Sequence, residues 1–358
     1  MALVTSIIYL STIIVFFFGQ LLRIEIKSIS FPVIDIFIAL IFCLNIFNKI
    51  KNKDFKVKNK YLLYFLVFAW FTFFFNYFRY NFDLIKPILY LFRLTFLLSF
   101  FIFPPKIDEK IKKFFYLAIF SNIIFGLIQY FFWPNFTYFN SLNWDPHLYR
   151  LISTFFDPTF TALIYLFLII IAFLDKKFPL RKIVLVISYL ALALTYSRST
   201  YLSFFIAFTF IAYQKKSLRI FILSSLLIFS TILLLPRLEG EGTKLERTSS
   251  ISAKIENYQE GFRLFRLSPV IGHGYNNLFY VRQIKNENSH ANSGFDGSLM
   301  TILTTTGLVG LTIFILGLKK IFINGNLKTK TILISLLFHS LFANSLFYPW
   351  ILLSFLFI

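Results

Sequence analysis

Long apolar runs separated by short polar segments extend from one end of the chain to the other. The runs cover residues 3–22, 31–47, 61–78, 84–103, 112–132, 159–174, 181–196, 200–213, 218–235, 298–318, 329–343 and 346–358. Most are long enough, as helices, to cross a hydrocarbon layer of about 30 Å. The pattern predicts an all-α fold, a polytopic transmembrane bundle of eleven or twelve helices in one membrane domain, residues 1–358. The count depends on whether Asn344 and the turn at Tyr348-Pro349-Trp350 separate two helices or kink one.

The composition agrees with a membrane protein. Of 358 residues, 58% are hydrophobic and only 15% are charged, and the mean hydropathy is +0.73. A soluble domain of this length needs more polar residues to cover its surface. The first run has no basic leader and no small-residue cleavage site, so we expect it to be retained as a helix. Cys43 is the single cysteine, which excludes an intrachain disulfide or a CxxC zinc site, and we expect it to be a small buried residue.

The basic residues indicate how the bundle is oriented. Of the 36 Lys and Arg residues, 21 lie in the alternate loops 48–60, 104–113, 175–182, 214–219 and 319–330. This is the positive-inside pattern, so the net charge of +20 points to the lipid bilayer and not to a nucleic-acid partner. The N-terminus is then cytoplasmic. The outer loops longer than ten residues are 133–158 and 236–297, and a polar site is expected there.

The larger outer loop, 236–297, contains a predicted amphipathic helix from Ser252 to Leu267. Its apolar residues recur at spacings of three and four, which places them on one face. Packing against the bundle core is the simplest explanation for this face, and contact with the membrane is the alternative. The stripe consists of Ile255, Tyr258, Phe262 and Phe265.

Arg198 is the first candidate for chemistry, because it lies between two apolar runs, in Ser197-Arg198-Ser199. An unpaired charge there costs several kcal/mol unless it reaches the interface or binds an anion. A planar guanidinium suits phosphate, which it can grip with two parallel hydrogen bonds. The alternative is an interfacial arginine that anchors a short turn.

Histidines are the natural general bases for a sugar hydroxyl. His290 lies eight residues before an apolar run, so it is expected near the outer membrane surface, although a loop histidine is often only solvated or structural. His273, between Gly272 and Gly274, is expected in a tight turn. The chain has no HExxH or carboxylate cluster for a metal, and no GxSxG, P-loop or GxGxxG motif. Serine hydrolases, NTPases and dinucleotide enzymes are therefore not indicated.

Four ordered segments carry a family resemblance. Residues 150–158 read Arg-Leu-Ile-Ser-Thr-Phe-Phe-Asp-Pro, and residues 197–199 read Ser-Arg-Ser. Residues 254–279 begin with Lys254 and include Ser-Pro-Val-Ile-Gly-His-Gly at 268–274. Residues 290–292 read His-Ala-Asn and lead to Gly-Leu-Val-Gly at 307–310. In this order the segments resemble the motifs of the O-antigen polymerase and ligase superfamily, integral membrane glycosyltransferases. Ser153, Ser199 and Ala291 depart from the usual Gly, Gly and uninterrupted His-Asn.

The resemblance implies an enzyme that uses undecaprenyl-diphosphate-linked glycans as donor and acceptor on the extracytoplasmic face of the inner membrane. It implies no metal and no cofactor, and it allows a chain-length regulator protein as a partner. His290 would be the catalytic base. The diphosphate would be held by Arg198, Lys254, Arg247 and Arg150, with Arg263, Arg266 and Asn292 as possible supporting residues.

The resemblance predicts a polymerase of O-antigen or another surface polysaccharide, since the motifs are degenerate and the chain is short. The close alternative is an O-antigen ligase, which passes the finished glycan to lipid A core or to protein. A lipid-linked sugar transporter, or flippase, is the rival from another class. It would show inverted repeats, broken helices at the midplane and charges deep within helices, of which only Arg93 is plainly deep.

Overall fold

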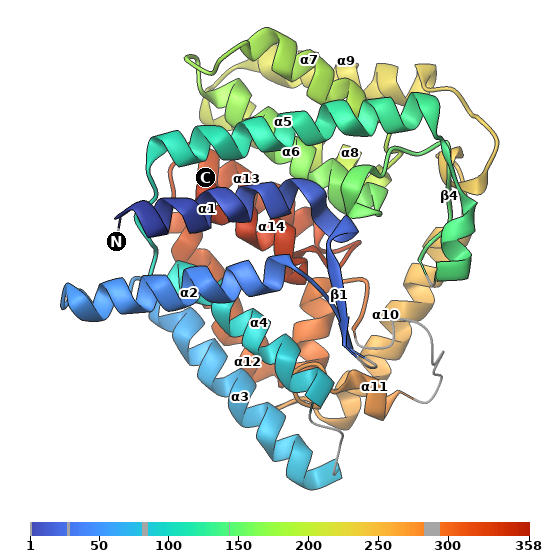
Figure 1. The fold of residues 1–358 in the computed structure, drawn as a ribbon. Coiled ribbons are helices and arrows are strands. Elements are labelled where there is room, and N and C mark those ends of the chain that lie inside the picture. The colour runs from blue at the N-terminus through green and yellow to red at the C-terminus, as the bar shows by residue number, and fades with distance from the viewer. Residues whose placement is uncertain (1, 27–28, 81–84, 143, 283–293) are drawn as a thin grey trace.

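The computed structural model describes residues 2–26, 29–80, 85–142, 144–282 and 294–358 (Figure 1). Each predicted apolar run coincides with a helix. In the first two thirds of the chain the helices are α1 (Ala2–Phe18), α2 (Ile34–Lys51), α3 (Lys60–Tyr80), α4 (Ile85–Ile102), α5 (Glu109–Phe132), α6 (Pro158–Leu174), α7 (Arg181–Ala193), α8 (Arg198–Gln214) and α9 (Leu218–Leu234). They are followed by α10 (Ser249–Leu267), α11 (Leu278–Val281), α12 (Ser298–Asn324), α13 (Leu327–His339) and α14 (Pro349–Ser354).

The protein is a multi-pass all-α membrane bundle. In the described residues, α1, α3, α4, α5 and α12 are long and apolar enough to cross a membrane, and α6 and α9 are shorter apolar helices. Helix α6 lies at the centre, because every residue from Thr161 to Ala172 is buried. The last apolar stretch is divided, since α13 ends at His339 and α14 begins at Pro349. Cys43 corrects our expectation: it is exposed on the outer face of α2, where bundle packing does not cover it.

Two short hairpins lie at one end of the bundle. Strand β1 (Arg23–Ile26) pairs antiparallel with β2 (Ile29–Pro32), and β3 (Asn135–Phe136) pairs antiparallel with β4 (His147–Leu148). Figure 1 shows β1, β4, α10 and α11 at the same end, away from the N-terminus. These elements come from the segments that the charge pattern assigns to the outer side.

Helix α12 is broken at Gly307, which has φ 64° and ψ −169°. The loop 268–274 fills the break. The backbone N–H groups of His273 and Gly274 donate to the carbonyls of Thr304 and Thr305 at 3.0 and 2.8 Å. On the other side of the break, the Leu308 N–H donates to the Pro269 carbonyl at 2.9 Å. The backbone groups freed by the break are therefore satisfied inside the protein, as a membrane environment requires.

The glycines at this junction allow the close approach. A Cβ on Gly307 would lie 2.1 Å from the Val270 carbonyl oxygen, and one on Gly272 would lie 2.4 Å from the carbonyl carbon of Thr305. The sequence segments 268–274 and 307–310 are thus one structural unit. His273 lies in the expected tight turn, buried, with its Nε2 atom 2.9 Å from the Leu264 carbonyl oxygen.

The amphipathic helix predicted in the large outer loop is confirmed as α10. The explanation of its apolar stripe by core packing holds only in part, because Tyr258 packs against a buried cluster whereas Ile255 and Phe262 are 54% and 49% exposed. The buried face of α10 is instead formed by Gly261 and Leu264, with Gly261 packed against Met300 of α12. The close contact at Gly261 brings α10 against α12, and Ile255 and Phe262 face away from it.

Candidate functional site

A cavity of about 1320 Å³ opens at the end of the bundle that carries the hairpins. Its walls come from segments far apart in the sequence. Among the described residues these are the β1–β2 hairpin, residues 144–160, the start of α8, residues 247–262 with the exposed stripe of α10, residues 294–296 and the turn before α14. The charge pattern assigns most of these segments to the outer side of the membrane.

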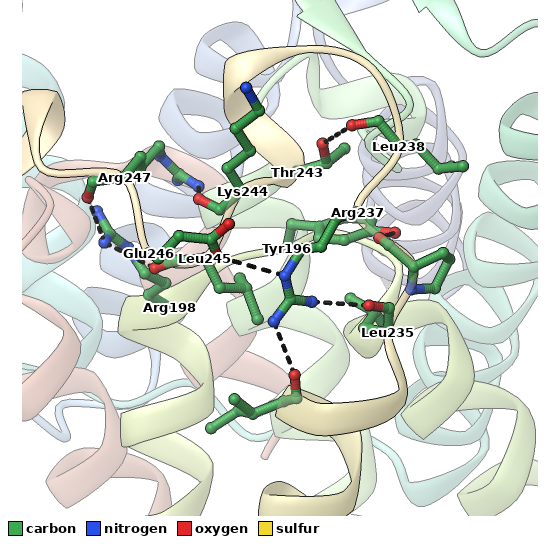
Figure 2. A network of polar contacts seen from close by, with 12 residues as sticks. Tyr196, Arg198, Leu235, Arg237, Leu238, Thr243, Lys244, Leu245, Glu246 and Arg247 are labelled. Carbon is green, nitrogen blue, oxygen red and sulfur yellow. Dashed lines mark hydrogen bonds and ion pairs between the residues drawn. The ribbon is translucent and has the colours of Figure 1, made fainter.

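Arg198 is the first residue of α8 and lies in the cavity wall. Its Nη1 atom donates to the carbonyls of Leu245 and Arg247 at 3.0 and 2.8 Å (Figure 2). Its Nη2 atom donates to Ser250 Oγ at 2.5 Å. One guanidinium thereby holds the loop before α10 and the first turn of that helix. The sequence left two roles open for Arg198, anchoring a turn or binding an anion. The structure shows that it anchors the loop before α10, and its side chain also lines the cavity.

The loop before α10 is also fixed at its other end, as Figure 2 shows. The Arg237 guanidinium donates to the Leu235 and Ile232 carbonyls at 2.7 and 2.8 Å and forms an ion pair with Glu246 at 3.3 Å. These are the free carbonyls at the C-terminal end of α9, where a cation is favoured. The Tyr196 hydroxyl donates to the Pro236 carbonyl at 2.9 Å. The loop thus has a defined conformation that carries Arg247 to the cavity.

Arg150 and Arg247 meet across Gly242. A Cβ on Gly242 would lie 2.6 Å from Arg150 Cδ, and the Arg247 Nη1 atom donates to the Gly242 carbonyl at 2.8 Å. Arg150 also donates from Nε to the Thr195 carbonyl at 3.0 Å. Burial, with a contribution from Arg247, lowers the pKa of the Arg150 guanidinium to about 10. Arg150 is therefore buried and Arg247 half-buried on the two sides of Gly242, an arrangement that suits an anion.

Lys254 approaches the cavity from α10. Its ammonium forms an ion pair with Asp296 at 3.1 Å and donates to the Phe342 carbonyl. The nearby Tyr258 hydroxyl donates to the Leu341 carbonyl at 2.6 Å. These contacts fasten α10 to the turn after α13, and Lys254 is only partly neutralised because it and Asp296 are both partly exposed.

The cavity carries an excess of positive charge. Among the described residues, six cationic side chains line it against three carboxylates. The cations are Arg23, Arg93, Arg150, Arg198, Arg247 and Lys254, and the carboxylates are Asp145, Asp157 and Asp296. Arg93, the deep charge noted in the sequence, forms an ion pair with Asp35. The remaining excess lies mainly around Arg150, Arg198 and Arg247.

The structure therefore brings together all four predicted diphosphate-binding residues, Arg150, Arg198, Arg247 and Lys254. Arg263 and Arg266, the possible supporting residues, are exposed on α10 and are not among the residues that line the cavity. His290 and Asn292 lie outside the described residues, and their roles stay predictions. Gly294 and Asp296, which follow them closely in the sequence, do line the cavity.

Sequence reasoning missed His339. This residue is fully buried at the end of α13, with Nδ1 2.6 Å from Ser345 Oγ and Nε2 3.1 Å from Thr200 Oγ1. It connects the turn that holds Lys254 to the helix that begins with Arg198. The signal was present in the sequence, because a histidine within an apolar run needs hydrogen-bond partners.

Comparison with known proteins identifies part of this assembly. Residues 183–315 match the family model described as O-antigen ligase. The match supports the O-antigen ligase and polymerase superfamily. It extends from α7 into α12 and includes Arg198, Arg247, Lys254 and the break at Gly307. No curated protein matches the chain. In coarse terms, the chain is a multi-pass membrane protein, and the match supports a glycosyltransferase-like enzyme of the O-antigen ligase kind.

Proposed function

We propose that the protein is a polymerase of O-antigen or a related surface polysaccharide. It moves a growing glycan from undecaprenyl diphosphate to a lipid-linked repeat unit on the extracytoplasmic face of the bacterial inner membrane, with its N-terminus in the cytoplasm. The observation that supports this most is the convergence of Arg150, Arg198, Arg247 and Lys254 on one cavity. A cluster of cations at the end of a membrane bundle suits a lipid diphosphate, which is anionic at one end and apolar at the other.

The proposed reaction is a single displacement with inversion at the anomeric carbon. The acceptor hydroxyl oxygen forms a bond to that carbon as the bond to the phosphate oxygen breaks. His290 takes the hydroxyl proton, and undecaprenyl diphosphate leaves with the bonding electrons. The cations of the cavity stabilise the negative charge that develops on the leaving group, and they need no metal to do so.

A ligase is the second candidate, because the matching family model is itself described as O-antigen ligase. A ligase uses the same donor site, so the cation cluster suits it equally. One feature favours a transporter, because α12 is broken at Gly307 and transporters contain broken helices. Against transport, Gly307 is not among the residues that line the cavity, and the backbone groups at the break bond to loop 268–274 and not to a ligand.

The test is the surface glycan of a strain that lacks this gene, separated on a gel after complementation. A polymerase predicts core capped by a single repeat in the deletion and in His290→Ala and Arg198→Ala, and a full ladder with the wild type. Arg263→Ala is the matched control, because this exposed arginine lies on the same loop helix and does not line the cavity. It should restore the ladder.

Other outcomes distinguish the alternatives. Bare core, with glycan left on the lipid carrier, would indicate a ligase. An unchanged ladder in the deletion strain would exclude both enzymes. Purified protein that moves lipid-linked sugar across liposome membranes without lengthening or transferring it would establish a transporter.

A further inference from the structure

The cavity is far larger than a diphosphate group, and its charge is not uniform. Arg198 and Arg247 lie on the side of the loop before α10. Another part of the wall is formed by the β1–β2 hairpin, residues 144–160 and Tyr348. Besides Arg23 and Arg150, this second part contains aromatic side chains and the carboxylates Asp145 and Asp157, and a carboxylate repels a phosphate.

Asp157 is one of the two carboxylates of this second part. Its Oδ1 atom caps α6 by accepting hydrogen bonds from the N–H groups of Thr159 and Phe160 at 2.6 and 3.1 Å. Its Oδ2 atom has no hydrogen-bond partner among the residues that the structure describes, although the side chain lines the cavity. Burial raises the pKa of the Asp157 carboxyl, and the two cap hydrogen bonds and Arg150 oppose this. One acceptor oxygen is therefore available to a ligand.

Aromatic rings border Asp157 through its sequence neighbours. Tyr348 stacks on Phe160, with ring centroids 4.1 Å apart and planes inclined by 14°. Trp144 meets Phe156 edge to face, with centroids 5.5 Å apart. Phe156 and Phe160 flank the cap residue in the sequence, so Trp144 and Tyr348 are held on the elements that position its carboxylate. Both rings line the cavity.

The β1–β2 hairpin holds these rings in place. The Arg23 guanidinium lies 5.4 Å from the Trp144 ring centroid and donates to Gln20 Oε1 at 2.6 Å. The Gln20 amide donates to the Tyr348 hydroxyl at 3.4 Å. Arg23 also donates to the Ser30 hydroxyl at 3.1 Å, so the guanidinium is engaged by neutral partners and by a ring. The wall is thus pre-organised, with both rings and the carboxylate facing one space.

We propose that Asp157, Trp144 and Tyr348 form the subsite that binds the non-reducing-end sugar of the acceptor. A sugar presents hydroxyl groups that donate to a carboxylate oxygen, and it presents apolar C–H faces that pack on aromatic rings. A neutral sugar avoids the repulsion that Asp157 exerts on a diphosphate. The subsite rests on the proposed function, because it gives the acceptor a place in the same cavity as the donor diphosphate.

The experiment separates the two sites by using two probes. The first is the lipid-free oligosaccharide released by mild acid from lipid-linked repeats of the deletion strain, and the second is undecaprenyl diphosphate without sugar. Binding of each to the full chain in nanodiscs is measured by calorimetry. The variants are Asp157→Asn, which retains a side chain able to cap α6, and Trp144→Ala. Trp133→Ala is the matched control, because Trp133 precedes the same loop, is 64% exposed and does not line the cavity.

We expect Asp157→Asn and Trp144→Ala to weaken oligosaccharide binding about tenfold or more, with binding of undecaprenyl diphosphate unchanged. Trp133→Ala should bind both probes as the wild type does. Wild-type affinity for the oligosaccharide in both variants, or no binding of it by the wild type, would overturn the subsite. The proposed function fails separately if the wild type does not bind undecaprenyl diphosphate.

Discussion

The Nε2 atom of His339 lies 3.2 Å from the hydroxyl oxygen of Ser199, the residue that follows Arg198. The two residues are 140 positions apart in the sequence, and neither nitrogen of the ring faces water. Through Ser345, the same imidazole fixes the turn after α13, whose Phe342 carbonyl accepts from Lys254. His339 thus couples the position of Arg198, at the start of α8, to that of Lys254, on α10.

We predict that His339→Leu lowers both stability and activity. The substitution removes the imidazole from the buried hydroxyls of Ser345 and Thr200. Each hydroxyl keeps another partner, so we expect a total cost of about 1–3 kcal/mol. Thermal unfolding of the purified protein in detergent measures the loss. His339→Gln, which keeps a polar side chain of similar reach, should recover a large part of it. A leucine variant as stable as the wild type would contradict this role.

Gly242→Ala tests the arrangement of the arginine pair. The new methyl group would lie 2.6 Å from Arg150 Cδ, so the Arg150 side chain must shift from its position beside Gly242. We expect weaker binding of undecaprenyl diphosphate, by about tenfold, and only a small change in unfolding temperature, because the displaced group is one side chain. Calorimetry in nanodiscs measures the affinity. Unchanged affinity would show that the spacing of the pair does not matter for the anion.

The sequence predicted the membrane bundle well because hydrophobic runs determine it locally. Each run became a helix, and the four basic residues singled out as diphosphate contacts line one cavity. His339 was missed, because its partners Thr200 and Ser345 are brought to it only by packing of α8 and α13. The stripe of α10 was predicted only in part for a related reason, since periodicity shows that a helix has an apolar face but not which residues of that face meet the core.

Tertiary structure also explains motifs that the sequence left unconnected. Nothing in the local pattern indicates that residues 268–274 insert into a break in α12, because the break is stabilised by hydrogen bonds between residues 31 to 39 positions apart. Gly307 has a positive φ where loop 268–274 contacts α12. The residues on both sides of it form one continuous apolar run, so the sequence predicts an unbroken helix there.

Gly307→Ala is therefore expected to be severe. Alanine disfavours φ +64°, and its Cβ would lie 2.1 Å from the Val270 carbonyl oxygen, which is backbone and cannot simply rotate away. The strain alone costs about 1–3 kcal/mol, and separation of the loop from α12 adds unsatisfied backbone groups. We expect little folded protein in membranes, measured by size-exclusion chromatography of a fluorescent fusion. Leu308→Ala is the control, because Leu308 is 51% exposed and should be tolerated.

His147 makes stability depend on pH. It lies in β4 and is 8% exposed, and its Nε2 atom has no partner in the described part of the chain. Burial, with a contribution from Arg150, lowers the pKa of this imidazole to about 3, against 6.5 for an ordinary histidine. Between these values the unfolded chain binds a proton that the folded chain does not. Stability must therefore fall as the pH is lowered from about 6.5 towards 3, by at most about 1.4 kcal/mol per pH unit for this group.

His147→Asn removes the titrating group and keeps a neutral polar side chain. We expect the variant to show a flatter decline of unfolding temperature between pH 7 and pH 4 than the wild type. The decline will not vanish, because burial also lowers the pKa of His273, which contributes in the same direction. Double substitution with His273→Asn should flatten it further. If His147→Asn keeps the full wild-type dependence of unfolding temperature on pH, the pKa of His147 is not lowered in the folded protein, and the imidazole is solvated there.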